Sequence, residues 1–268
     1  MIVAGVDIGS LTGKAVIMAE GSIKSSGIVL SKPIPQETAK LVMSETLDKA
    51  NLKMEDIDYI VGTGYGRMKV PFANTDVSEI SCHTKGAVWL VPTVRTIVDI
   101  GGQDCKAISV NEKGDVRDFV MNDKCAAGTG RFLEVAARVL GLTLDELGPE
   151  AFKATKPSAI SSQCCIFAES EIISYLAENR SIPDLAAGLI RSVVVRIISM
   201  VKKVGFKKDL TMTGGVAKNP AIVKFLEVEF GEIMRMPIDP QLVGAVGAAL
   251  FAGERLLKES NRISEVIK

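Results

Sequence analysis

Apolar residues along the chain predict a series of strands and helices that occurs twice. Residues 1–31 contain three Val- and Ile-rich runs separated by turn residues, which predict three strands. An amphipathic stretch over 36–51 predicts a helix, and it is followed by a predicted strand over 57–62 and a helix over 78–90. Residues 94–121 then repeat the three-strand pattern. The periodicity therefore predicts an α/β protein with two similar halves.

The second half contains more predicted helix than the first. After residue 121 the pattern predicts helices near 129–140, 167–178 and 184–204, a strand over 208–213, a helix over 218–230, a short strand over 232–236 and a helix over 241–259. The last helix has small residues at helical spacing, which is typical of tight helix packing. No low-complexity linker is present, so we expect two domains, 1–96 and 97–268, joined by a hinge. The last helix is a candidate to pack back on the first domain.

One turn motif occurs in both halves. The pattern D-I-G-x-x-x-x-K runs from Asp7 to Lys14 and again from Asp99 to Lys106. Apolar strand-like runs flank each copy, so each predicts a β-hairpin, whereas a Walker loop requires another glycine spacing and a following helix. Turn amides suit phosphate oxygens, and a carboxylate at a strand end suits hydrated Mg²⁺. The pair predicts two related domains that bind one nucleoside triphosphate; two ordinary glycine turns are the alternative.

A second glycine motif follows the predicted strand at 208–213. Thr213, Gly214 and Gly215 lie between that strand and a predicted helix. Two adjacent glycines allow close approach of a base or a phosphate, although a pair of packing glycines explains the motif equally well.

Charge and hydropathy argue against several classes of protein. The 268 residues include 32 Lys and Arg against 32 Asp and Glu, so the formal net charge is zero. Binding to nucleic acid or to an anionic membrane needs excess positive charge, and neither is expected. No apolar run reaches the roughly 18 residues of a membrane span, and the N-terminus lacks the features of a signal peptide. We therefore expect a cytoplasmic protein.

The cysteine pattern favours neither a disulfide framework nor a zinc site. The five cysteines are Cys82, Cys105, Cys125, Cys164 and Cys165. Their number is odd, no C-x-x-C pair occurs, and His83 is the only histidine. We expect Cys105 to serve packing, and we expect Cys82 and His83 to be core or surface residues of a helix.

Five motifs together resemble one protein family. They are TGYGR (63–67), SEISCHTKGA (78–87), VDIGGQDCK (98–106), NDKCAAGTGRFLE (122–134) and SSQCCIFAESEII (161–173). The two hairpins and the Thr-Gly-Gly turn resemble the actin/hexokinase/Hsp70-type ATPase superfamily. The full set resembles the activator components of 2-hydroxyacyl-CoA dehydratases, which are related to ATP-binding subunits of benzoyl-CoA reductases. The resemblance covers essentially the whole chain. It implies duplicated ribonuclease H-like domains with a nucleotide cleft between them.

The resemblance also implies a homodimer with one [4Fe-4S] cluster, and it assigns Cys125 and Cys164 as ligands. A cubane cluster takes four thiolates, so two per chain imply a cluster shared across a two-fold axis. Each cysteine precedes a predicted helix, whose N-terminal amides would stabilise thiolates. Cys165 is a competing ligand, although alignment with the motif favours Cys164. Buried apolar thiols are the alternative for Cys125 and Cys164.

We expect ATP or ADP to bind with Mg²⁺. The residues expected to hold the phosphates are Gly9, Ser10, Leu11, Thr12, Gly13, Lys14, Gly101, Gly102 and Gln103. Asp7 and Asp99 are expected to orient Mg²⁺ through water, and Gln103 or Asp104 to position the attacking water. The other expected cofactor-binding residues are Gly128, Thr129, Gly214, Gly215, Lys218, Asn219 and Gln241.

By resemblance, ATP hydrolysis drives a low-potential electron to a partner dehydratase or a related iron–sulfur reductase, with ferredoxin or flavodoxin as donor. We expect the nucleotide state to change the angle between the Cys125 helix and its mate in the dimer. Two alternatives remain: a metabolite kinase of the same fold, and an ATP-binding sensor without turnover. The sequence names neither the partner enzyme nor its acyl-CoA.

Overall fold

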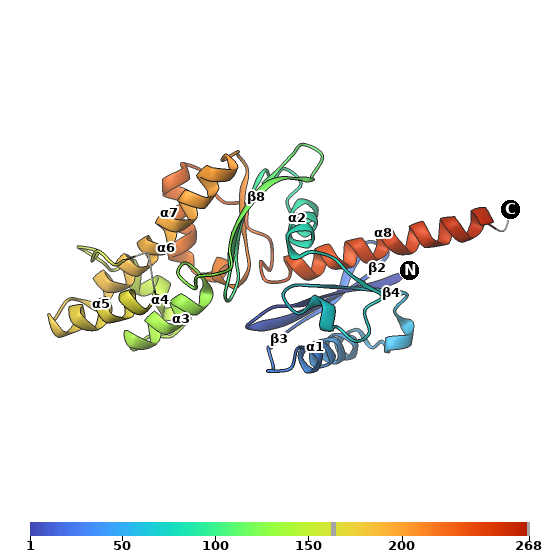
Figure 1. Ribbon diagram of the computed structural model, residues 1–268, viewed down its shortest axis with the longest axis horizontal. Coiled ribbons are helices and arrows are strands. Elements are labelled where there is room, and N and C mark those ends of the chain that lie inside the picture. The colour runs from blue at the N-terminus through green and yellow to red at the C-terminus, as the bar shows by residue number, and fades with distance from the viewer. Residues whose placement is uncertain (162–164, 267–268) are drawn as a thin grey trace. The chain divides into compact units, whose positions relative to one another are not determined.

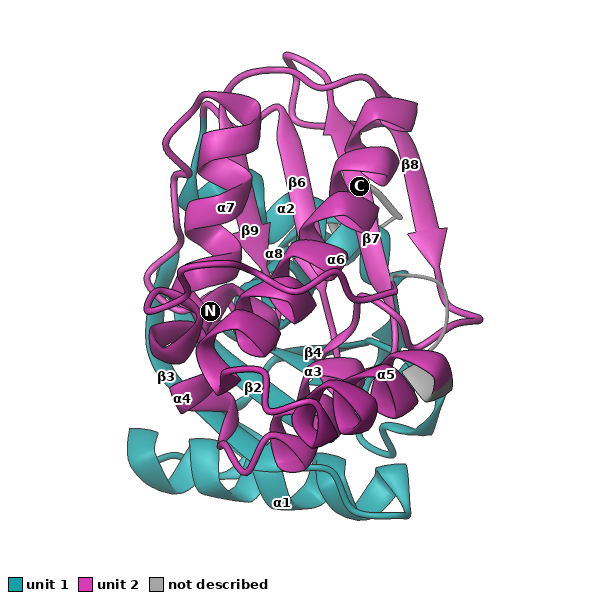
Figure 2. Ribbon diagram, turned by 90° about the vertical axis from the view of Figure 1, so that its left-hand side faces the viewer, with its two compact units in different colours: residues 1–92, 241–268 teal, residues 93–240 magenta. Residues whose placement is uncertain are grey.

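The structure is a computed structural model that describes residues 1–161 and 165–266. The chain forms two compact units, Met1–Pro92 with Gln241–Lys268, and Thr93–Pro240 (Figure 2). The expected boundary after residue 96 lies inside a strand of the second unit, and the chain changes unit at Pro92–Thr93 instead. The last helix belongs to the first unit. Among the described residues, no helix has the length and apolarity to cross a membrane.

The first unit is a five-stranded sheet with helices on both faces (Figure 1). Its elements are β1 (Ile2–Ile8), β2 (Thr12–Ala19), β3 (Ser22–Leu30), α1 (Pro35–Ala50), η1 (Met54–Asp56), β4 (Tyr59–Thr63), η2 (Arg67–Lys69), β5 (Thr75–Asp76), α2 (Glu79–Leu90) and α8 (Val243–Val266). The strand order is β3-β2-β1-β4-β5. β1 pairs antiparallel with β2 and parallel with β4.

Alternation along β1 divides the core of this unit in two. Val6 and Ile8 pack in the cluster that contains α1, while Val3 packs in the cluster that contains α8. Gly5 also faces α8, because a Cβ there would overlap the backbone of Ala245. The predicted tight packing of the last helix is therefore confirmed, since a larger side chain at Gly5 would push α8 off the sheet.

The second unit is a four-stranded sheet of order β8-β7-β6-β9. Its elements are β6 (Thr96–Ile100), β7 (Cys105–Val110), β8 (Val116–Asn122), α3 (Gly130–Val139), α4 (Leu144–Ala151), α5 (Cys165–Ala177), α6 (Ile182–Val204), β9 (Leu210–Thr213), η3 (Gly215–Lys218) and α7 (Pro220–Phe230). α6 packs against the strands and against α7, and Figure 2 shows both helices in front of this sheet. Most predicted elements are confirmed to within a few residues.

Two predictions in this unit are wrong. Helix α4 was not expected, because Gly148 and Pro149 within it are typical of a turn. It begins with a capping box in which Thr143 accepts from Glu146 N, and that cap stabilises the first turn. The predicted strand over 232–236 does not form; Arg235 N donates to Leu210 O (2.9 Å), but no strand is assigned there.

The two sheets share one topology, which confirms the predicted duplication. In each, three antiparallel strands are followed by a strand that pairs in parallel with the first. The units differ between the third and fourth strands. The first unit has one long helix there, α1, whereas the second has α3, α4, α5 and α6. The segment that contains Cys125 therefore belongs to an addition that the first unit lacks.

Candidate active site

Hairpin 1, from Asp7 to Lys14, is closed by a short turn and an ion pair. Asp7 is the sixth of the seven residues of β1, and its partner across the ladder is Lys14. Lys14 Nζ lies 3.3 Å from Asp7 Oδ2. Gly9 N donates to Thr12 O (3.0 Å), and Ser31 Oγ donates to Gly9 O (2.9 Å). The side chain of Asp7 is buried, whereas that of Lys14 is half-buried.

The tip of hairpin 1 is suited to bind an anion. Gly9, Ser10, Leu11 and Thr12 are half-buried, and Gly13 is buried beneath them. Within the described part of the chain, the amides of Ser10 and Leu11 donate to no protein acceptor. Exposed turn amides beside a lysine form the kind of concave donor set that binds phosphate.

Hairpin 2, from Asp99 to Lys106, has the same register but a different ion-pair network. Lys106 Nζ lies 3.1 Å from Asp99 Oδ2 and 2.7 Å from Asp104 Oδ2. Thr213 Oγ1 donates to Asp99 Oδ1 (2.7 Å). Lys106 is only 2% exposed, and Gly101 N donates to Asp104 O (3.0 Å). Two carboxylates around one ammonium group leave this hairpin with net negative charge.

The exposed tip of hairpin 2 contains the other predicted phosphate and water contacts. Gly101 and Gly102 are half-buried, Gln103 is exposed, and Asp104 is half-buried. Asp104 is held by Lys106, whereas Gln103 makes no polar contact within the described residues. Of the two residues expected to position water, Gln103 is thus the more exposed.

A Thr-Gly pair follows the parallel strand in both units, and only one of the two was recognised from the sequence. Gly64 has φ +85° and Gly214 has φ +84°, a conformation that favours glycine. A Cβ on Gly64 would press against Ile8 O (2.7 Å), and one on Gly214 would overlap Ile100 O. Each glycine therefore lets the turn pass beside a hairpin. The recurrence of T-G after the fourth strand of each half is the signal that could have shown this.

Four of the other residues expected to bind the cofactor, Gly215, Lys218, Asn219 and Gln241, are held in different ways. Gly215 begins η3, and Lys218 Nζ lies 3.7 Å from Asp239 Oδ1. Asn219 Oδ1 accepts from the amides of Ala221 and Ile222, both at 3.1 Å, so it caps α7. The helix predicted from 218 thus begins at Pro220, and Asn219 has a structural task. Gln241 is half-buried just before α8, in the first unit.

The cysteine loop, residues 123–129, joins β8 to α3. Cys125 is half-buried in it. Asn122 Nδ2 donates to Cys125 O (2.8 Å) and to Ala127 O (3.4 Å). Gly128 has φ +84°, and a Cβ on it would lie 2.8 Å from Arg196 Cδ. Thr129 is fully buried, and its hydroxyl donates to Ala126 O (2.6 Å), so this side chain stabilises the loop itself.

The start of α3 is bonded to the tip of hairpin 2. Gly130 N donates to Gly101 O (2.9 Å), and Arg131 N donates to Gly102 O (2.8 Å). The sequence had led us to expect that these amides would stabilise the Cys125 thiolate. Because they donate to hairpin 2, the amides of Gly130 and Arg131 are not available to it. The physical reason is that the first four amides of a helix need acceptors from outside it, and the tip of hairpin 2 supplies two carbonyls.

Two other cysteines, Cys82 and Cys105, do not suit metal binding. Cys82 is fully buried, and burial raises the pKa of its thiol to about 12. Cys105 is buried beside Met200 Sδ (3.5 Å), and burial raises the pKa of its thiol also. Thiolates are the form that binds iron, so the half-buried Cys125 suits a cluster better than Cys82 or Cys105 does. Cys164 lies outside the described residues, and α5 begins at Cys165.

His83 lies closer to hairpin 1 than the sequence suggested. It is buried on α2, and Glu79, one turn earlier, brings a carboxylate oxygen within 4.8 Å of a ring nitrogen. A Cβ on Gly244 would lie 2.8 Å from His83 Nε2 and 3.0 Å from Asp7 Oδ2. The glycine thus lets the histidine and the aspartate approach one another within the first unit.

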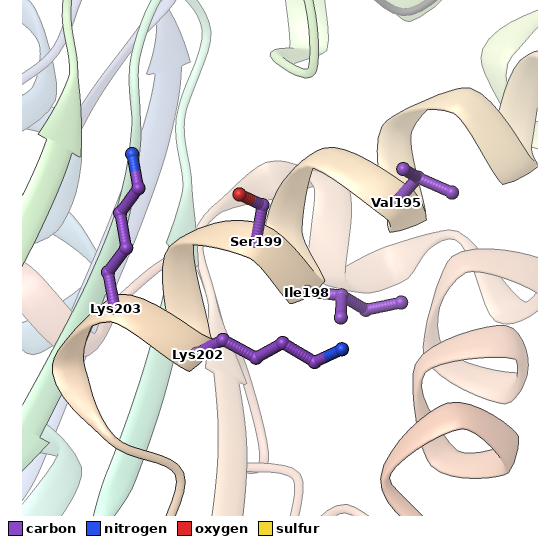
Figure 3. Close-up of a pocket in the computed structure, with 5 residues that line it drawn as sticks. All are labelled: Val195, Ile198, Ser199, Lys202 and Lys203. Atoms are coloured by element: carbon purple, nitrogen blue, oxygen red, sulfur yellow. The ribbon is translucent and has the colours of Figure 1, made fainter.

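A surface hollow of about 570 Å³ lies along α6, away from these residues. It is lined by Val195, Ile198, Ser199, Lys202 and Lys203. Figure 3 shows all five on one helix, with the two lysines on its last turn. Its lining contains neither a carboxylate nor a thiol.

Comparison with known proteins finds relatives over nearly the whole chain. An activator of lactoyl-CoA dehydratase from Anaerotignum propionicum is 46% identical over 263 residues, which covers 97% of this chain and 100% of that protein. The crystal structure of component A of the (R)-2-hydroxyglutaryl-CoA dehydratase from Acidaminococcus fermentans is 41% identical, with a TM-score of 0.91 and coverage of 96% and 99%.

A second solved structure contains a bound nucleotide analogue. It is the activator of the 2-hydroxyisocaproyl-CoA dehydratase from Clostridium difficile with bound ADPNP, 41% identical, with a TM-score of 0.93 and 98% coverage of both chains. A Streptomyces griseus glucokinase of the ROK family, 14% identical with a TM-score of 0.56, shares the actin/hexokinase-like fold alone. Residues 4–252 match the model of one ATPase family. The duplicated fold, the paired hairpins and this match show that the chain belongs to the BadF/BadG/BcrA/BcrD ATPase family.

Proposed function

We propose that the chain is an ATP-hydrolysing activator that delivers a low-potential electron to a 2-hydroxyacyl-CoA dehydratase or a related reductase. The observation that carries this proposal is the direct bonding of the hairpin 2 tip to the first amides of α3, beside the Cys125 loop. A phosphate-binding turn and a half-buried cysteine thus share one hydrogen-bonded unit. The names of the relatives, which are activators of such dehydratases, support the proposal.

Both hairpins would contribute to the nucleotide site. In hairpin 1, the amides of Ser10 and Leu11 and the ammonium group of Lys14 would neutralise phosphate oxygens. Asp99 already accepts from Thr213 and Lys106, which fits contact with Mg²⁺ through water; Asp7 would act in the same way. Gln103, exposed at the tip of hairpin 2, would orient the attacking water.

Cys125 and Cys164 from two copies of the chain would hold one [4Fe-4S] cluster. Two thiolates per chain are half of a cubane's ligand set, so the proposal requires a homodimer. When bound, the cluster supplies one-electron transfer. The role of the chain is to hold it at the cysteine loop, where Cys125 is half-buried, and to bring that loop to the partner enzyme. A ferredoxin or flavodoxin would supply the electron.

The test is ATP-dependent activation of a dehydratase under exclusion of oxygen. The iron-loaded protein is mixed with a 2-hydroxyacyl-CoA dehydratase, its acyl-CoA, dithionite, Mg²⁺ and ATP, and dehydration is followed. We expect activity to require ATP and to be lost in Cys125→Ser. Cys82→Ala, a change at a buried cysteine of the first unit, is the matched control and should retain activity. Equal activation by Cys125→Ser, or activation without ATP, would contradict the proposal. ATP-dependent phosphorylation of a metabolite would favour a kinase instead.

A further inference from the structure

Asn122 lies where the cysteine loop leaves the sheet. It is the last residue of β8, and its ladder partner on β7 is Cys105, in hairpin 2. Its Nδ2 donates to Cys125 O (2.8 Å) and Ala127 O (3.4 Å), and it lies 3.9 Å from Cys105 Sγ. One amide group therefore contacts both the middle of the cysteine loop and hairpin 2.

The other end of the loop is fixed to the same hairpin by the main chain. The amides of Gly130 and Arg131 donate to the carbonyls of Gly101 and Gly102. The cysteine loop is thus held at its α3 end by the phosphate turn and at its β8 end by Asn122. A shift of the turn would move one end of the loop, while Asn122 holds the carbonyl of Cys125 to the sheet.

We propose that Asn122 is a positioning residue that ties the presentation of the Cys125 thiol to the nucleotide state of hairpin 2. This inference rests on the proposed function, because it needs a nucleotide whose phosphates contact Gly101 and Gly102. Without the Asn122 amide the backbone of Cys125 is no longer fixed to β8. When α3 moves, the whole loop then shifts with it, and the exposure of the Cys125 thiol no longer changes.

The chain provides a matched control in the same hairpin. Asn111 lies in the turn between β7 and β8, at the end opposite to Asn122. Its Oδ1 accepts from Lys113 N and Asp115 N, both at 2.9 Å. Asn111→Ala therefore removes an asparagine that orders a local turn of the same two strands, without touching the cysteine loop.

The experiment measures the alkylation of Cys125 in the cluster-free, reduced full-length chain. Iodoacetamide is added in pulses with and without Mg²⁺–ADP, and the modified Cys125 peptide is quantified by mass spectrometry. Loss of one amide–carbonyl bond typically changes a local opening equilibrium by about three- to tenfold. We expect ADP to change the alkylation rate of Cys125 by about three- to tenfold in the wild type and in Asn111→Ala. In Asn122→Ala the rates with and without ADP should be equal.

The affinity for ADP, measured by calorimetry, distinguishes a failure of the inference about Asn122 from a failure of the proposed function. Asn122→Ala should bind ADP within about twofold of the wild type, because Asn122 contacts no nucleotide in this scheme. A nucleotide-dependent rate that persists in Asn122→Ala would overturn the inference. So would a wild type that binds ADP without any change at Cys125, and both results leave the ATPase proposal standing. A wild type that binds neither ADP nor ATP would overturn the proposed function and this inference with it.

Asn122→Asp, which keeps the shape of the side chain but removes its donor, replaces the alanine variant if that variant does not fold. We expect the same loss of the ADP effect on Cys125 alkylation.

Discussion

Hairpins 1 and 2 have the same backbone arrangement but differ in the environment of the lysine. In both, an Asp near the end of a strand lies opposite a Lys, and the parallel neighbour supplies a Thr followed by a Gly with positive φ. Lys106 is buried between Asp99 and Asp104, whereas Lys14 is half-buried beside Asp7. We therefore propose two roles for the repeated motif: Lys14 binds a phosphate, and Lys106 balances buried charge.

Removing each lysine in turn tests the two roles separately. We expect these changes to have the largest effects on stability and on ATP hydrolysis. Lys106→Met leaves two carboxylates, one of them deeply buried, without their cation, so we expect a loss of about 3–5 kcal/mol in unfolding free energy. Lys14→Met leaves one carboxylate unpaired and should cost about 1–3 kcal/mol. ATP hydrolysis by Lys14→Met should nevertheless fall by about a hundredfold. Urea unfolding and ATPase rates check both; equal loss of stability in the two variants would show that the lysines are equivalent.

Equivalent Gly→Ala changes in the two units test whether the Thr-Gly turn lies equally close to hairpin 1 and to hairpin 2. Gly64→Ala and Gly214→Ala each place a Cβ at positive φ against the carbonyl that ends the neighbouring strand. We expect each to lower the unfolding free energy by about 2–4 kcal/mol, from backbone strain and overlap together. Gly21→Ala is the control, because it also has positive φ but has open space around it, and it should cost about 1–2 kcal/mol. A cost no greater than that of the control at either site would show that the site has room.

A single exchange should make hairpin 1 resemble hairpin 2. Thr12 occupies the position that Asp104 has in the second copy of the motif. Thr12→Asp should give Lys14 a second carboxylate and repel phosphate, so we expect KM for ATP to rise about tenfold, or about 1.4 kcal/mol. Thr12→Asn, similar in shape but neutral, should change KM by less than about threefold. An unchanged KM in Thr12→Asp would place the phosphates away from this tip.

The smallest expected effect concerns the helices that follow the third strand in each unit. Helix α1 has no side-chain cap, whereas Ser181 caps α6 by accepting from Asp184 N, and Ser181 Oγ also donates to the Asp184 carboxylate (2.7 Å). A hydrogen bond from Ser181, followed by one from Lys156 N, lowers the pKa of Asp184 below its ordinary value. A lowered folded-state pKa stabilises the fold above the unfolded-state pKa of about 3.9, and this contribution is lost as the pH falls through the folded-state value.

Asp184→Asn should therefore be less stable than the wild type at pH 7, and the difference should shrink as the pH falls below about 4. Thermal unfolding of both proteins between pH 7 and the lowest pH at which they fold measures it. Asp145→Asn, an exposed first-turn acid of α4, is the control. A difference between wild type and Asp184→Asn that grows at low pH would contradict this assignment of the cap.

The sequence predicted the frame better than the environment of its side chains. Because D-I-G-x-x-x-x-K fixes a hairpin length, the register of Asp7 with Lys14 followed from spacing alone. The burial of Lys106 did not, since it depends on Asp104 folding back across the turn and on Thr213 from a distant strand. Helix α4 was missed because a capping box outweighed Gly148 and Pro149.

The site shows the same limit at longer range. Cys125 was found by its motif, but the acceptors of the α3 amides were not, because Gly101 and Gly102 belong to another part of the chain. Asn219 stays a predicted cofactor contact, but its role as the cap of α7, which its position before Pro220 indicates, was not predicted. Hydrogen bonds between distant segments are set by the fold and leave no local pattern in the sequence.

The most direct test of the electron-activator role is the iron and acid-labile sulfide content of the protein purified without oxygen. We predict about four of each per dimer in the wild type, lost in Cys125→Ser and in Cys164→Ser and retained in Cys82→Ala. Loss in Cys165→Ser in place of Cys164→Ser would change the ligand and keep the role. Iron retained in Cys125→Ser, or no iron in a wild type that binds ATP, would contradict it.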